Sequence, residues 1–441
     1  AGLTPGENTE VHVNGRYTNA EFHYPTDFSG APVDSNAYRV QHRLTVGIDA
    51  KTRLSSSMSG RVMLGSNEVS DLTEDIVRPF APTLPVPQEV NTVFLSRNKR
   101  RSAEGMITLH LPAASTLNVG GEYVEETERS TNSEGPVGGA TAPTSSFDAK
   151  RDNKAVYTEL TATSAAGSSW TLSARRDDNS DYDAFTSYRA GLSVPAGLQS
   201  RLRASISTSF NAPAFNQIHP TLYTTGSPDL KPERARSWEV GLEQVIAYGT
   251  IKLSGSYFNQ RFRDLIQYVS GGPPAFLGSY SNLAEAESNG YEAEIILTPV
   301  SELSASASYT RVKPRVAEVS DDYTGDLAPG DPLLRRPEHS GTATLTWART
   351  RTGSLSMLAS YVGERPDLDF AEFPAKRVIL PSYVKLDVAG SAALLRSESR
   401  RYALSMTVRV DNVLDRKYED VLRFPAPRRT YLIGARIEGA M

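Results

Sequence analysis

The chain has 441 residues, a formal net charge of −4 at pH 7 and no cysteine. Such a length allows two or three ordinary domains or one large barrel. The missing cysteines exclude disulfides and thiolate metal sites, and the small net charge gives no case for nucleic acid as a partner.

Two-faced strands run along the whole chain with little sign of helix between them. The residues from Trp238 to Glu243, for example, alternate between apolar and polar, which is typical of a strand with two different faces. No apolar run reaches the roughly 18 residues of a membrane-spanning helix. We expect about eighteen strands by the same signals, at roughly residues 9–26, 38–52, 56–72, 100–112, 115–131, 149–164, 168–178, 184–196, 198–211, 235–247, 249–268, 283–299, 301–314, 338–350, 353–364, 380–394, 401–414 and 428–440.

The connections between these strands are short and long in turn. Short ones include Pro112–Ser115 and Tyr248–Thr250. The long ones include Thr73–Lys99, Ser130–Lys150, Asn211–Ala235, Gln267–Asn282, Lys313–Pro337 and Glu364–Leu380. Outer-membrane barrels have short periplasmic turns and long extracellular loops, whereas a soluble sandwich has long loops at both ends. We therefore predict an all-β fold, a transmembrane antiparallel β-barrel with an even strand number, as one domain over residues 1–441.

The alternation also assigns the two faces of the barrel wall. We expect the lipid face to include Leu253, Leu345, Val384 and Leu386. We expect the interior to include the charged residues Glu239, Glu243, Lys252, Lys385, Asp387 and Arg436. The tryptophans and several tyrosines near strand ends fit either an interfacial girdle or ordinary strand aromatics.

Several stretches, taken together and in this order, resemble TonB-dependent outer-membrane receptors of the cobalamin and siderophore branch. They are STSFNAPAFNQ (207–217), GSPDLKPERARSWEVGLEQ (226–244), SNLAEAESNGYEAEI (281–295), PLLRRPEHSGTATLTW (332–347) and VDNVLDRKYEDVLRFPAPRRTYLIGARIEG (410–439). The resemblance implies a barrel of about 22 strands with an N-terminal plug and a short segment, the TonB box, that engages TonB. We identify neither plug nor TonB box here, and the chain is similar to the later strands of such a barrel. Its last residue, Met441, departs from the aromatic residue usual at that position in the family.

Candidate ligand-binding side chains lie in the long connections. Aromatic residues there could cap a bulky ligand, and two arginines could contact its carboxylate or phosphate groups. The candidates are Phe215, His219, Tyr223, Phe276, Tyr280, Arg365, Phe370, Phe373 and Arg377.

No motif for catalysis or cofactor binding is present in the sequence. A phosphate-binding glycine loop, a GxSxG elbow and HExxH are all missing, so we expect no enzyme activity and no cofactor. The six histidines have no metal-ligand spacing. The one acidic cluster is a weak calcium candidate, for which a solvated turn is the favoured alternative: Asp177, Asp178, Asp181 and Asp183.

Two functions from different classes remain open on the sequence. The resemblance implies a receptor barrel in the outer membrane of a Gram-negative bacterium that takes up a scarce small-molecule or metal-chelate ligand, with TonB engaged through a plug. The alternative is a plugless barrel that acts as a passive pore or as a scaffold for envelope proteins. Outer-membrane lipid is a partner in both.

Overall fold

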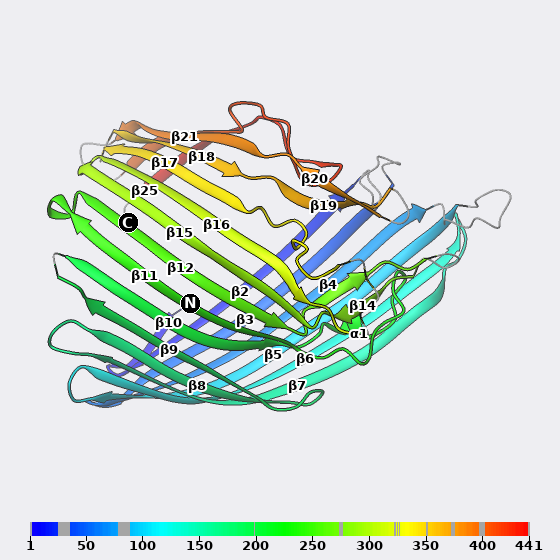
Figure 1. The fold of residues 1–441 in the computed structure, drawn as a ribbon, viewed down its shortest axis with the longest axis horizontal. Coiled ribbons are helices and arrows are strands. Elements are labelled where there is room, and N and C mark those ends of the chain that lie inside the picture. Colours follow the sequence, from blue (N-terminus) through cyan, green and yellow to red (C-terminus); the bar gives the residue numbers. More distant parts are fainter. Residues whose placement is uncertain are drawn as a thin grey trace.

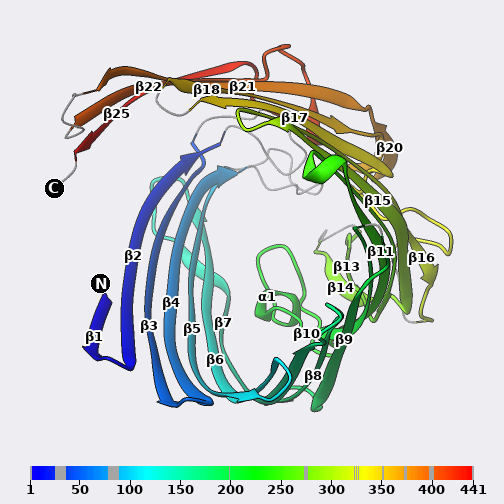
Figure 2. The same cartoon turned by 90° about the vertical axis from the view of Figure 1, so that its left-hand side faces the viewer.

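A computed structural model describes residues 2–24, 36–77, 89–197, 199–272, 277–321, 323, 325, 327–349, 352–371, 375–396 and 402–439. Nineteen strands form one antiparallel sheet in which successive sheet strands pair in chain order. The sheet curls into a barrel around a central lumen (Figures 1 and 2). The predicted all-β barrel is confirmed. The described residues form one sheet strand more than the eighteen expected, an odd number where an even one was predicted, because the short β1 pairs with the beginning of β2.

The bounds of the sheet strands follow the alternating segments closely. They are β1 (Gly2–Gly6), β2 (Thr9–His23), β3 (Tyr38–Ser55), β4 (Met58–Val77), β5 (Val90–Leu111), β6 (Ser115–Pro136), β7 (Ala142–Thr163), β8 (Ser169–Asn179), β9 (Phe185–Pro195), β10 (Ser200–Asn211), β11 (Glu233–Ile246), β12 (Ile251–Arg263), β15 (Glu285–Val300), β16 (Leu303–Glu318), β17 (His339–Arg349), β18 (Gly353–Val362), β21 (Tyr383–Arg396), β22 (Tyr402–Asp411) and β25 (Thr430–Gly439).

The remaining elements are small and belong to the connections. They are the helix α1 (Phe215–Ile218), a 3-10 turn (Ala247–Gly249), and the two-stranded pairs β13 (Ile266–Val269) with β14 (Ser279–Asn282), β19 (Arg365–Asp369) with β20 (Lys376–Leu380), and β23 (Glu419–Val421) with β24 (Phe424–Pro425). Over the described ranges, no helix has the length and apolar character needed to cross a membrane.

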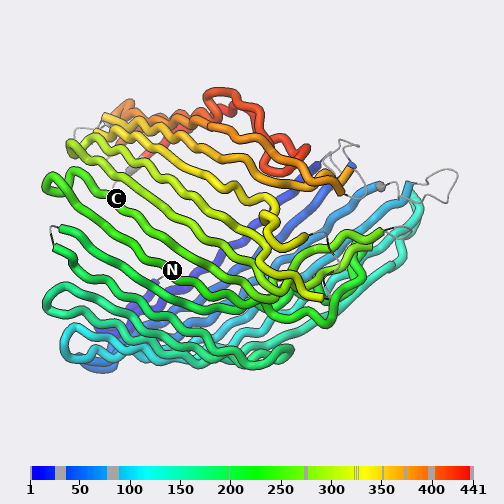
Figure 3. The backbone as a smooth tube through the Cα atoms, viewed as in Figure 1, coloured from blue at the N-terminus to red at the C-terminus, as the bar shows by residue number. Residues whose placement is uncertain are grey.

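Short turns lie at one end of the barrel and long connections at the other, as the trace in Figure 3 shows. Two predicted long loops are wrong in extent. β4 and β5 continue to Val77 and from Val90, and β6 and β7 continue to Pro136 and from Ala142. The reason is that strand pairing continues above the apolar band through polar residues, with ion pairs such as that of Arg97 with Glu68 at 2.6 Å.

Register places the apolar residues on the outer face of the wall. Val240 and Leu242 on β11 are 49% and 47% exposed, as expected for side chains that meet lipid rather than protein. On the opposite face of the same sheet, Lys252 lies 3.6 Å from Glu243 in an ion pair. The predicted division into an apolar outer face and a charged inner face therefore holds for these strands.

Aromatic side chains form a row on the outer face at the end that carries the long loops. The ring of Trp238 lies 5.5 Å from that of Tyr257, and the ring of Tyr291 lies 6.3 Å from that of Tyr309. The register links Tyr257 directly to Tyr291. This row favours the interfacial-girdle interpretation, because amphipathic rings lie where hydrocarbon meets headgroups.

A charge on the outer face should destabilise the barrel far more than one on the inner face. We expect Leu242→Arg to cost on the order of 2–4 kcal/mol near the middle of the membrane, and Ser256→Arg, on the inner face of the neighbouring β12, to cost little. Urea unfolding of the barrel in lipid vesicles, followed by tryptophan fluorescence, measures both. Equal losses of unfolding free energy would show that the faces are assigned the wrong way.

Candidate functional site

The connection between β10 and β11, residues 212–232, folds inward and carries α1 within the outline of the barrel (Figure 2). It is anchored to the wall by Arg151 on β7. The Arg151 Nη1 donates to the carbonyl oxygen of Pro213 at 2.9 Å, and its guanidinium lies 4.8 Å from the centre of the Phe215 ring. Its Nη2 lies 2.8 Å from a carboxylate oxygen of Glu126. One nearly buried arginine thus joins the inward loop to two wall strands.

The same loop is held by a ring contact to the wall and by a close approach within the loop. The His219 ring stacks on Phe147 of β7 with a centroid distance of 4.8 Å. Gly226 has φ +74, and a Cβ added there would lie 2.6 Å from the His219 backbone. A side chain at Gly226 is therefore excluded by both the left-handed backbone and the close approach.

On its other side the loop is bonded to the β13–β14 hairpin. The amide of Gly278 donates to the carbonyl oxygen of Tyr223, and the amide of Thr225 donates to that of Gly278, both at 2.9 Å. The amide of Tyr280 donates to Ser227 Oγ at 3.0 Å. Burial raises the pKa of the Tyr280 phenol, so this hydroxyl stays protonated at neutral pH.

A small apolar cluster supports the hairpin from below. Leu283, Ala286 and Val316 are completely buried, and Leu230 from the inward loop is 5% exposed. Burial of these apolar residues adds to the backbone hydrogen bonds that hold the loop and hairpin beside β15 and β16.

A second polar cluster joins the hairpins β19–β20 and β23–β24; we call it the rim clamp. Asp367 is completely buried, accepts from Arg335 Nε at 2.8 Å and from the amide of Leu422 at 2.8 Å. Arg423 lies 2.7 Å from Asp369. Such buried, paired charges fix loop positions because leaving either partner alone would be costly.

The candidate residues from the sequence are divided between these two places. Phe215, His219, Tyr223 and Tyr280 come together at the inward loop, where Phe215 is 7% exposed and Tyr223 is 67% exposed. Phe276 and Phe373 lie outside the described residues. Phe370 directly follows β19.

The two candidate arginines are engaged with protein groups. Arg365 is 3% exposed, donates to Asp420 at 3.0 Å in the rim clamp and lies over the Tyr383 ring. Arg377 Nη2 donates to Asp331 at 2.8 Å. Of the two, Arg377 is the more accessible.

The four acidic residues of the calcium candidate do not converge. Asp177 is buried and accepts from Arg175 on the inner face, whereas Asp178 follows it on the opposite face of β8. Asp181 accepts from Ser180 Oγ at 2.7 Å. In the described part of the chain no three histidine or acidic side chains are grouped as a metal site.

Sequence reasoning missed Arg151 and Phe147, on which the inward loop rests. Both lie within a predicted strand or beside it, and neither shows a local signal of its partner. Arg151 and Pro213 are separated by 62 positions in the chain. Only the fold of the loop brings them together.

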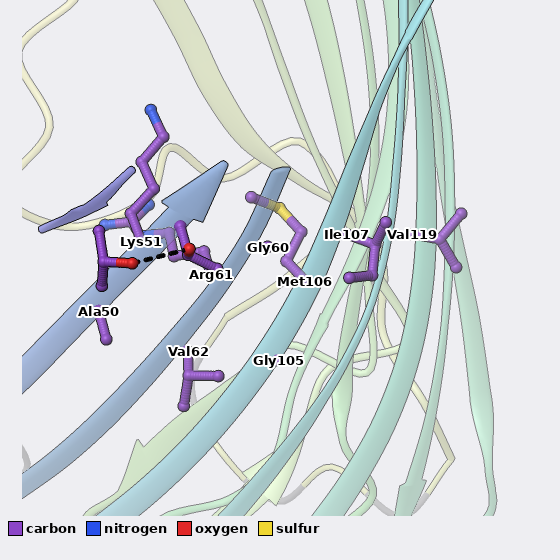
Figure 4. Close-up of a pocket in the computed structure, with 11 residues that line it drawn as sticks. Ala50, Lys51, Gly60, Arg61, Val62, Gly105, Met106, Ile107 and Val119 are labelled. Carbon is purple, nitrogen blue, oxygen red and sulfur yellow. Dashed lines mark hydrogen bonds between the residues drawn. The ribbon is translucent and has the colours of Figure 1, made fainter. Parts of the chain in front are cut away.

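A cavity of about 380 Å³ lies far from these loops, near the turn end of the wall (Figure 4). Its lining includes Gly60 and Gly105, which have no side chains to fill it, and the apolar Val62, Ile107 and Val119. The strands around it are continuously paired, and Val62, Ile107 and Val119 are exposed on the outer face, so it is a depression in the wall surface rather than part of the mouth.

Comparison with known proteins gives a consistent result. The family model "TonB dependent receptor-like, beta-barrel" matches residues 2–413. The vitamin B12 transporter BtuB of Vibrio vulnificus is 27% identical over 412 residues, which cover 93% of this chain and 58% of the transporter. The chain therefore spans less than two thirds of the length of that curated relative.

Solved structures resemble the chain in fold. The ferric-catecholate import receptor Fiu of E. coli K12 has a TM-score of 0.74 at 14% identity, covering 98% of this chain and 73% of that one. A mutant of the ferric enterobactin receptor PfeA of Pseudomonas aeruginosa has a TM-score of 0.73 at 16% identity, covering 98% of this chain and 68% of that one.

Removing the anchor of the inward loop should release it. We expect Arg151→Met to raise hydrogen–deuterium exchange across residues 212–232, because a hydrogen bond to a charged donor and a cation–π contact together contribute about 2–4 kcal/mol. Arg176→Met, on the outer face of β8, is the matched control. Unchanged exchange in Arg151→Met would show that the loop does not depend on this anchor.

Asp415, in the connection after β22, should make the stability of this connection fall as the pH is lowered. Asp415 accepts from Arg428 Nε at 2.9 Å and from the amide of Arg429 at 3.1 Å, and Arg428 lowers the pKa of Asp415 to about 2. Because the folded pKa is depressed, this contribution is full above the unfolded pKa, near 4, and is lost as pH falls towards 2.

Amide exchange in residues 412–429 should therefore rise between pH 4 and pH 2, after correction for the intrinsic exchange rate. Asp415→Asn should exchange faster at neutral pH and lose this pH step. A step of the same size in Asp415→Asn would assign it to another group.

Proposed function

The chain belongs to the TonB-dependent receptor-like β-barrel family and lies in the outer membrane of a Gram-negative bacterium, and from this premise we propose that it is the barrel of an uptake receptor. The ligand is a scarce, bulky metal chelate of the ferric-siderophore or cobalamin type. The barrel captures it from outside the cell and passes it inward with energy supplied through TonB.

The inward loop is the observation that supports ligand capture best. The loop carries α1 within the barrel outline (Figure 2), and we propose that Tyr223, His219 and Tyr280, which lie on this loop or against it, meet the ligand as it enters the mouth. Flat, amphipathic rings suit a large rigid chelate, since they offer apolar area together with a hydroxyl or ring nitrogen for its polar edge. The backbone bonds to β13–β14 hold these rings in place before a ligand arrives, which lowers the entropy lost on binding.

The relatives favour the same ligand class without choosing within it. One is named a vitamin B12 transporter, and two structural neighbours are named for ferric-catecholate and ferric enterobactin. What these ligands share is a metal held in a bulky organic chelate. We therefore propose the class and leave the individual compound to experiment.

The remaining sequence candidates fit a second contact region at the rim. We propose that Arg377 and Phe370, with Phe276 and Phe373, complete the ligand surface from the outer loops. Arg365 instead supports that surface from within the rim clamp, because its guanidinium is already bonded to Asp420. Asp177, Asp178, Asp181 and Asp183 have no part in it.

The charged inner face is consistent with a plug as partner. Glu239, Glu243 and Lys252 lie on that face, and polar groups of a plug could pair with them. The alternative, a passive pore or scaffold for envelope proteins, would leave the same residues facing water. Neither proposal includes a catalytic activity.

Ligand binding should depend on the exposed ring of the inward loop. With purified barrel protein and cyanocobalamin or ferric enterobactin as probes, we expect Tyr223→Ala to weaken binding of one probe by roughly 5- to 30-fold, as for loss of about 1–2 kcal/mol of ring contact. Tyr248→Ala, in the turn at the opposite end, is the matched control.

Uptake should also require TonB. Cells that make the whole gene product should accumulate the labelled probe only when TonB is present. Binding of neither probe class, together with large and steady ion conductance of the native gene product in planar bilayers, would overturn the receptor in favour of the pore.

A further inference from the structure

The outer face of β11, β12 and β16 carries an excess of basic side chains directly beyond the aromatic row; we call it the outer basic patch. Among the described residues, seven basic side chains share this face with four acidic ones, Glu285, Glu287, Glu318 and Glu338. The basic residues are Arg234, Arg236, Arg261, Arg263, Arg311, Lys313 and Arg315.

The register places this patch at headgroup level. On β11, Arg236 lies two residues before Trp238 on the same face, and on β16, which runs in the opposite direction, Arg311 lies two residues after Tyr309. Both arginines are therefore on the loop side of the aromatic row. Two residues along a strand cover about 7 Å, so the first charged row begins just beyond the aromatic rings. The rings mark the edge of the hydrocarbon, and the patch lies towards the long loops, that is, in the outer leaflet.

The patch is not neutralised by the protein itself. Arg234 lies directly opposite Arg263, and Arg236 directly opposite Arg261. Directly opposed like charges destabilise a sheet unless an anion lies between them. Among the described residues no hydrogen-bond or ion-pair partner of Arg236 is found, and Arg234 rests over the Phe185 ring.

The acidic residues within the patch are shared among several cations. Glu285 lies 2.9 Å from Arg261 and 3.6 Å from Arg263. Glu338 lies 2.7 Å from Arg311 and 3.8 Å from Lys313. Each of these carboxylates serves two basic groups, so a positive excess remains.

The other side of the barrel shows that opposed arginines can each have a carboxylate partner. On β5 and β6, Arg97 also lies opposite Arg129 on the outer face. There, however, Arg97 pairs with Glu68 at 2.6 Å and Arg129 pairs with Asp148. Carboxylates are shared there as well, since Glu68 also lies 3.6 Å from Lys99. What distinguishes the outer basic patch is that Arg236, opposite Arg261, has no carboxylate partner among the described residues.

We propose that the outer basic patch is a binding site for the phosphate-bearing headgroup of an outer-leaflet lipid. A phosphate offers several acceptor oxygens to the paired arginines, and the acyl chains below it lie against Trp238, Tyr257 and the apolar band. The site is independent of the ligand taken up through the lumen, since it lies on the other face of the wall.

Fluorescence of Trp238 can test this proposal directly. The chain has three tryptophans, so Trp170→Phe with Trp347→Phe leaves Trp238, beside the patch, as the only reporter. The protein is reconstituted in phosphatidylcholine vesicles, and quenching by brominated phosphatidic acid is compared with quenching by brominated phosphatidylcholine. We expect phosphatidic acid to be preferred by on the order of tenfold in relative association constant.

Charge variants locate the preference. The double variant Arg236→Gln with Arg261→Gln should reduce the ratio of the association constants for phosphatidic acid and phosphatidylcholine nearly to one. The double variant Arg236→Lys with Arg261→Lys should retain most of this preference. Arg101→Gln with Arg176→Gln removes the same charge from the outer face of β5 and β8 and should leave it unchanged. If the first variant fails to fold, Lys313→Gln with Arg315→Gln tests the same patch from β16.

Three results would overturn the proposal. One is equal quenching by the two lipids in the parent protein. Another is an equal loss of preference in the patch variant and in the Arg101–Arg176 control, which would indicate general surface charge. The third is loss of the preference on adding inorganic phosphate equimolar to phosphatidic acid, which would indicate a site for free anions rather than for a lipid.

Discussion

Backbone hydrogen bonding between neighbouring strands is the constraint on which the rest of this structure depends. Hydrocarbon offers no donor or acceptor, so each amide and carbonyl within the membrane must find its partner on an adjacent strand. The strands from β3 to β22 in the sheet meet this condition by pairing with a neighbour on each side, in chain order. Once the ladder is formed, side chains can only alternate between lipid and lumen, and each strand must therefore be two-faced.

The ladder also explains why stability and function are separated along the barrel axis. Within the apolar band, side chains stabilise the barrel in two ways. Apolar ones face the lipid, and charged ones on the lumen face form ion pairs, as Lys252 and Glu243 do. Beyond the band, water can satisfy the backbone, and the chain is free to form connections of varied shape. The inward loop and the rim clamp both lie there, and both use buried arginines to fix loops that have little apolar area to bury.

The two faces of the wall lead to two different kinds of recognition. The inner side, with the loop anchored by Arg151, suits a soluble ligand that enters the mouth. The outer side, between Trp238 and Arg315, suits a lipid that is already in the membrane. A single strand such as β11 serves both, because its odd residues face the lumen and its even residues face the lipid.

The sequence by itself determined the barrel, its two faces and the separation of turns from loops. These are local properties: alternation has a period of two residues, and the position of every strand from β2 to β25 in the sheet could be read from neighbouring residues. The motifs between residues 207 and 439 were sufficient to indicate the family. The strand ends above the membrane were not, because polar residues pair there without an apolar pattern to mark them, as Arg97 does with Glu68.

Only the tertiary structure decided what the loops do. Arg151 holds Pro213 across 62 positions, and Asp367 accepts from the amide of Leu422 across 55. Partners so distant leave no trace in local composition, which is why Arg365 looked like a ligand contact and is a buried clamp residue. The outer basic patch has the same origin: its arginines come from three strands that are unremarkable singly, and only the register of the sheet brings their like charges face to face.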